Sequence, residues 1–156
     1  MTRSITANEQ RDIDWDWCAV DAEGHIGHFT SAGVARLPTS VAQDFNAAKS
    51  LIAFFNHLSP ATTFIVPRDL EDRCGVWKDG MARERYLKSF DHAARRGLFS
   101  YDIAVSGSAY FRVATPDTPL HFDKVPSAIR LLLNRTRASI EFYYSLDIPA
   151  QDTLNW

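Results

Sequence analysis

Cysteine is scarce in this sequence, and long hydrophobic runs are missing from it. Cys18 and Cys74 are its two cysteines, so a scaffold built from disulfides is excluded. No apolar run approaches the roughly 18 residues that span a membrane, and residues 1–12 lack the apolar core of a secretory signal. Two cysteines without an evident partner suit a reducing compartment, so we expect a cytoplasmic protein without a membrane segment.

An excess of charge of one sign is also missing. The 17 basic and 19 acidic residues leave a net charge of −2, so we do not expect a nucleic-acid-binding protein. The seven glycines show none of the spacings that cradle a phosphate or a dinucleotide, and no G-x-S-x-G segment is present. We therefore predict neither a cofactor nor a catalytic residue, although an enzyme is not excluded.

Two patterns resemble metal sites, and each lacks something the site requires. Four acidic residues have the spacing of a calcium-binding loop: Asp12, Asp14, Asp16 and Glu23. Trp17 stands where that loop needs glycine, and the segment that follows is typical of a strand. His25 and His28 are three residues apart, which places them on opposite faces of a strand. We therefore predict no metal site from these patterns. A site assembled from residues that are distant in the sequence is the alternative that is left open.

Apolar and aromatic residues are plentiful. Hydrophobic residues make up 46% of the chain, which includes four Trp, five Tyr and ten Phe. A chain of this length and composition can bury one hydrophobic core, which excludes a disordered protein. We therefore predict a single domain over residues 1–156, with flexible ends at about 1–12 and 147–156.

Hydrophobic periodicity predicts an α+β fold. Alternating residues predict hairpins at 15–30 and 99–115, a short strand at 63–66 and a C-terminal strand at 138–146. Apolar stripes predict two longer helices at 39–58 and 81–96 and a short one at 125–133. Hairpins separated by helices favour a mainly antiparallel sheet, built from two hairpins and the last strand and covered by these helices.

The second predicted helix carries a basic stripe. Its cations recur at helical spacing: Arg85, Lys88, His92, Arg95 and Arg96. Such a stripe can bind an acidic partner surface or a phosphate backbone. It can equally be a solvated helix face, because Glu84 and Asp91 are interleaved with the cations.

Tryptophan supplies the remaining candidates for binding. Trp77 lies in a charged segment with few local packing partners, so we predict that it is an exposed anchor. Trp15 and Trp17 lie on the same side of a predicted strand. They can line a pocket or binding surface, or they can pack into the core.

Residues 17–33 carry a pattern, W-x-A-x-D-x-x-G-x-I-x-x-F-x-S-x-G, which resembles the opening of an uncharacterised family of bacterial proteins. Residues 96–102 and 110–120 look like the second hairpin of the same family. Such proteins are similar in character to the immunity proteins of bacterial polymorphic toxin systems, and residues 33–38 with the following helix resemble the SUKH group of that class. The resemblance implies a cytosolic protein that binds another protein, and it implies no catalytic residues.

Two hypotheses of function follow. The first is a non-enzymatic protein-binding domain of immunity type, which uses Trp77, the basic stripe and the acidic segment at 12–16. The second is a small enzyme or ligand-binding domain with a pocket beside the first hairpin. Five residues would line that pocket: Trp15, Trp17, Asp21, His25 and His28. A concave pocket with converging polar groups would favour the second hypothesis.

Overall fold

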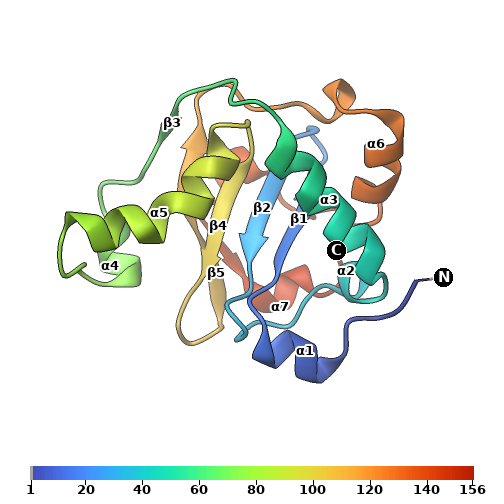
Figure 1. The fold of residues 1–156 in the computed structure, drawn as a ribbon, viewed down its shortest axis with the longest axis horizontal. Helices are drawn as coiled ribbons and strands as arrows, with labels where there is room; N and C mark the ends of the chain where they lie inside the picture. Colours follow the sequence, from blue (N-terminus) through green and yellow to red (C-terminus); the bar gives the residue numbers. More distant parts are fainter. Residues whose placement is uncertain (1) are drawn as a thin grey trace.

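A six-stranded sheet runs through the computed structural model, which describes residues 2–156 (Figure 1). The first four strands in spatial order are β1 (Asp16–Val20), β2 (Ile26–Thr30), β4 (Phe99–Ile103) and β5 (Ala109–Pro116). The outer side of β5 pairs with both β3 (Phe64–Ile65) and β6 (Asp147–Pro149). Both predicted hairpins are confirmed, as β1–β2 and β4–β5.

The two hairpins are joined through a parallel pairing of β2 with β4. The sheet is therefore mixed, and the prediction of a mainly antiparallel sheet was wrong. A parallel pair needs a long crossover connection, and residues 31–98 supply one that contains most of the helical layer. Sequence periodicity shows which segments are strands, but it does not show which neighbours they choose.

Seven α-helices are present among residues 2–156, more than the three predicted. They are α1 (Ala7–Asp12), α2 (Thr39–Ala42), α3 (Phe45–His57), α4 (Leu70–Cys74), α5 (Gly80–Ala94), α6 (Ser127–Leu133) and α7 (Ala150–Thr153). The predicted helix at 39–58 is divided into α2 and α3, because the Asp44 carboxylate accepts a hydrogen bond from the Ala47 N–H and caps a new helix. Two short 3-10 helices are η1 (Phe122–Lys124) and η2 (Phe142–Tyr144).

The predicted C-terminal strand at 138–146 was wrong. This segment is irregular and includes η2, and it buries Phe142 while Tyr144 is 77% exposed. The Phe142 N–H donates to Oδ2 of Asp21 over 2.9 Å. A buried side chain thus takes a backbone group that a neighbouring strand would otherwise have bonded.

Both ends of the chain contribute to the structure. Ile5 and Trp156 are buried, and α1 begins with a capping box in which Thr6 and Glu9 bond each other's backbone N–H. The segments predicted to be flexible therefore contain helices and buried side chains.

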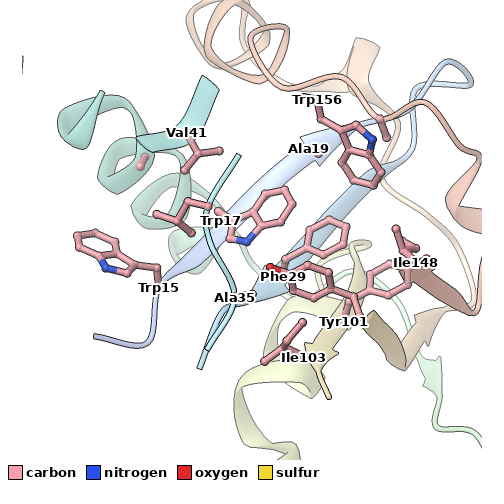
Figure 2. Close-up of a cluster of buried hydrophobic side chains, with 14 of the residues drawn as sticks. Trp15, Trp17, Ala19, Phe29, Ala35, Val41, Tyr101, Ile103, Ile148 and Trp156 are labelled. Atoms are coloured by element: carbon pink, nitrogen blue, oxygen red, sulfur yellow. The ribbon is translucent and has the colours of Figure 1, made fainter. Parts of the chain in front are cut away.

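One face of the sheet carries an aromatic core. The Trp17 and Phe29 rings stack with centroids 4.2 Å apart, and Phe29 stacks on Tyr101 at 4.9 Å. Trp156 meets the edge of this stack, and Trp15 lies at its border (Figure 2). Trp15 and Trp17 are both buried in this core, and Trp15 also borders an open hollow of about 440 Å³.

The opposite face of the sheet lies under α3 and α5. Helix α3 packs on β1, α5 packs on β4 and β5, and the two helices converge toward their C-terminal ends (Figure 1). Leu51 and Phe55 of α3 belong to one buried cluster on this face. Leu87 and Phe90 of α5 belong to a second one. Helix α5 also places Ala93 in the cluster of α3, so the two helices share apolar packing there. A strip of sheet between the two clusters remains.

Candidate functional site

That strip of sheet is polar. Five side chains from β1, β2 and β4 form what we call the polar band: Asp16, His28, Thr30, Ser100 and Asp102. His28 and Ser100 are register partners in the parallel pairing, and they are 5% and 0% exposed. Their neighbours Phe29 and Tyr101 point to the aromatic core, because side chains alternate along a strand.

His28 has a polar neighbour at each ring nitrogen. Its Nδ1 lies 2.8 Å from Oγ of Ser100, and its Nε2 lies 3.5 Å from Oδ2 of Asp16. Ser100 is enclosed, whereas the Asp16 side chain is 35% exposed. The ring therefore connects the interior of the sheet with its surface. Ser100 is too deeply buried to act as a nucleophile on a substrate.

The other end of the polar band is a closed hydrogen-bond network. Thr30 Oγ1 and the Tyr86 hydroxyl each donate to the Asp102 carboxylate over 2.8 Å. Burial, together with the nearby Asp102 charge, raises the pKa of Tyr86. This network joins α5 to the sheet. Because its side chains form hydrogen bonds with one another, we assign it a structural role.

An open hollow of about 440 Å³ lies over the His28 end of the band, and we call it the inner cleft. Asp16 and His28 border it from the sheet, and Asn56 borders it from α3. Helix α5 contributes three cationic or titratable residues to its wall: Arg85, Lys88 and His92. The cleft lies between α3, whose Leu51 and Phe55 pack in one apolar cluster, and the part of α5 whose Leu87 and Phe90 pack in another.

A second hollow, of about 620 Å³, follows the other side of α5, and we call it the outer groove. Arg85, Lys88 and His92 border both hollows, so they stand on the ridge between them. Arg95 and Arg96 border the outer groove alone.

Arg85 and Lys88 are exposed, and within residues 2–156 neither side chain takes part in a hydrogen bond or an ion pair. The Arg95 guanidinium lies 4.9 Å from the ring centroid of Phe64, and that contact occupies its planar face. Of the predicted basic stripe, Arg85 and Lys88 are thus the cations whose charged groups are left to solvent.

Arg96 has a structural role. Its Nε donates to the Leu58 carbonyl over 2.7 Å, and its Nη1 donates to the His92 carbonyl over 2.9 Å. It therefore ties the end of α5 to the end of α3. Burial and the nearby Arg96 charge lower the pKa of His92, which favours the neutral ring on the ridge.

Trp77 lies outside both hollows and is half-buried. Its ring packs on Tyr86 at 5.5 Å, and the Arg83 guanidinium lies 5.6 Å from its centroid. Part of the ring surface that the sequence suggested as an anchor is thus covered by α5.

Asp21 and His25 do not join His28. Asp21 is fully buried, and its Oδ1 accepts hydrogen bonds from the N–H groups of Glu23 and His25. The His25 ring lies 5.3 Å from Phe99, on the aromatic face of the sheet. The two histidines thus lie on opposite faces, as their spacing predicts. Among residues 2–156 no cluster of three or more His, Cys, Asp or Glu is arranged to hold a metal.

The pattern at 17–33 describes how the first hairpin is built. Gly24 has φ of +84°, and a Cβ there would lie 2.3 Å from the His121 ring. Ser31 Oγ accepts a hydrogen bond from the Trp15 N–H over 2.9 Å. Turn geometry and burial thus explain the residues that the pattern specifies, and none of these borders the inner cleft. His28 does border it, but the pattern allows any residue at that position.

Sequence reasoning missed Ser100, Asn56 and the position of Asp16 beside His28. Ser100 and Asp102 alternate with Phe99 and Tyr101, which is typical of a strand with one solvated face. The number of helices is the signal that could have revealed the site. When helices cover the second face of a sheet, the polar residues that alternate along its strands become buried.

Comparison with models of protein families, with curated proteins and with solved structures finds no match to this chain. Among residues 2–156, no helix combines the length and the apolar character needed to cross a membrane.

Proposed function

We propose that this chain is a protein-binding domain that docks an acidic surface of its partner on the α5 ridge. The observation that carries the proposal is the pair Arg85 and Lys88, two exposed cations without an ion-pair partner among residues 2–156. Positions three apart on a helix face the same way, so one acidic segment can contact both.

The shape around the ridge supports this use. The outer groove and the inner cleft flank α5, so an extended partner segment can lie on one side and place side chains on the other. Met81, 69% exposed at the start of α5, adds an apolar contact beside the outer groove. Glu84 and Asp91 interrupt the positive charge, which suits a shaped protein surface better than a uniform phosphate backbone.

Immunity to a toxin is the narrower form of the proposal, and it rests on the sequence resemblance of residues 17–33. Co-expression with the products of adjacent genes tests it directly. We expect one of those products to arrest growth and this chain to restore growth. Restoration by a variant with both cations reversed, Arg85→Glu with Lys88→Glu, would contradict a role for the ridge.

Selection of peptides from a random displayed library tests the broader proposal without a known partner. We expect the selected sequences to be enriched in Asp and Glu. The Arg85→Glu/Lys88→Glu variant should lose that enrichment, because the two charges that attract acidic peptides are reversed.

A matched control reverses two other exposed cations, Arg68→Glu with Lys124→Glu, which lie outside both hollows. This variant changes the net charge equally and should still select acidic peptides. Equal loss in both variants, or no acidic enrichment with the unmodified chain, would refute the proposal.

A further inference from the structure

We infer that the inner cleft is a binding site for a phosphate monoester, with His28 at its floor and Arg85 and Lys88 at its rim. This goes beyond the proposed function, because the ligand is a small anionic group and the site lies on one side of the ridge. Of the five residues that the second hypothesis assigned to a pocket beside the first hairpin, His28 is the one that borders this cleft.

His28 is the part of the cleft that a solvated helix face does not explain. Its side chain is only 6% exposed, yet its ring borders the cleft. Ser100 Oγ lies 2.8 Å from Nδ1, and no other partner competes for that hydroxyl among residues 2–156. When the hydroxyl donates to Nδ1, Nε2 carries the proton and becomes a fixed donor.

Among residues 2–156, that donor makes only one long contact. Nε2 lies 3.5 Å from Oδ2 of Asp16, which is longer than an ordinary N–H···O hydrogen bond. An oxygen of a bound ligand can therefore accept from Nε2 without breaking a good hydrogen bond. A buried imidazole with a fixed orientation is preorganised for binding. The conformational entropy of the ring is lost when the protein folds, so it is not lost again when a ligand binds.

The rim supplies the charge that an anion needs. The Arg85 guanidinium can donate two parallel hydrogen bonds to neighbouring oxygens, and the Lys88 ammonium adds a mobile point charge. Asn56 contributes an uncharged amide from the α3 side. The geometry is thus a buried donor below two permanent cations, with a neutral donor opposite them.

Asp16 reduces the positive charge of the cleft without removing it. Its carboxylate borders the same cleft and offsets one of the two rim charges. The net positive charge that remains attracts a phosphate monoester, which carries about −1.5 to −2 at neutral pH, more strongly than a carboxylate of charge −1, and the phosphate offers three acceptor oxygens. The cleft volume of about 440 Å³ leaves room for the group esterified to the phosphate.

Calorimetric titration with four probes tests the inference: inorganic phosphate, glycerol 3-phosphate, a phosphoserine peptide and acetate. We expect saturable binding of the phosphates and none of acetate at equal concentration. Tighter binding of glycerol 3-phosphate would indicate a free metabolite, and tighter binding of the phosphopeptide would indicate a modified partner. Absence of saturation with all three phosphates would overturn the inference.

Three variants locate the site. His28→Gln and Lys88→Gln should each weaken phosphate binding by about tenfold, the size expected for one charge-assisted hydrogen bond. Arg95→Gln, which changes the outer groove alone, should leave binding within about twofold. Because Lys88 is exposed, its variant decides the question even if His28→Gln does not fold. Unchanged binding by Lys88→Gln would overturn the inference.

The two proposals fail separately. If acidic peptides bind and phosphates do not, the inner cleft is not a ligand site and the docking ridge stands. If phosphates bind and acidic peptides do not, the ridge proposal falls and the phosphate site stands.

Discussion

His28 and Ser100 lie side by side in the parallel pairing of β2 with β4, with Nδ1 and Oγ 2.8 Å apart. The two residues are separated by most of the helical layer in the sequence and are both buried. The hydrogen bond between them therefore forms only when the two hairpins pair in the observed register.

Replacing Ser100→Ala should leave a buried imidazole nitrogen without its partner. We expect a loss of about 1–3 kcal/mol in the free energy of unfolding, measured by urea denaturation. Ser50→Ala, at an exposed position of α3, is the matched control and should change stability by less than about 0.5 kcal/mol. Equal stability of both variants would show that the His28–Ser100 bond does not support the fold.

Asp21 should be critical for folding. Its two oxygens accept hydrogen bonds from the N–H groups of Glu23, His25 and Phe142, and the side chain is fully buried. Asp21→Ala leaves three donors without acceptors, so we expect a loss of about 3 kcal/mol or more. Asp21→Asn keeps one acceptor oxygen and should lose less. Denaturation curves that rank the two variants in the opposite order would contradict this role.

Arg112 should hold the irregular C-terminal segment in place. It is buried, and its guanidinium donates to the Tyr101 hydroxyl and to the carbonyls of Phe142 and Ser145. Arg112→Met keeps the bulk of the side chain but removes these donors, so we expect a loss of about 2–3 kcal/mol in stability. Amide hydrogen exchange should accelerate first at residues 142–145, and uniform acceleration across the sheet would argue against this role.

The N-terminal helix should weaken at acidic pH. Hydrogen bonds from Arg3 and from the Thr6 backbone lower the pKa of Glu9 to about 2. A carboxyl whose pKa is lower in the folded state stabilises above its unfolded pKa, and that stabilisation is lost as the pH falls through the folded value. The stability advantage over Glu9→Gln should therefore be full above pH 5 and shrink between about pH 4.5 and 2. Urea midpoints measured across this range test it, and a constant difference would contradict it.

Local patterns in the sequence identified much of the fold. The alternation of Phe99, Tyr101 and Ile103 locates β4, and the apolar stripe of Leu87, Phe90 and Ala94 locates α5. Such patterns depend on which face of one element is buried, and that information is local. The basic residues Arg85 and Lys88 were identified for the same reason, because the helical spacing alone places them together.

The inner cleft could not be predicted in this way. It depends on which strands become neighbours, since Ser100 reaches His28 only through the parallel pairing. The prediction of a strand at 138–146 was wrong for a related reason. Its alternating Phe142, Tyr144 and Leu146 are typical of a strand, but Asp21 and Arg112 take its backbone groups. Contacts made by buried polar side chains over long sequence distances leave no periodic signal.

The most direct test of the docking ridge is a charge-swap cycle, measured as the dissociation constant of one library-selected acidic peptide. We expect Arg85→Glu/Lys88→Glu to weaken binding at least about a hundredfold, since two charge pairs are lost. Replacing the acidic residues of the peptide by Lys should then restore binding to that variant while abolishing binding to the unmodified chain. Unchanged affinity in the variant, or no restoration by the swapped peptide, would contradict the role of Arg85 and Lys88.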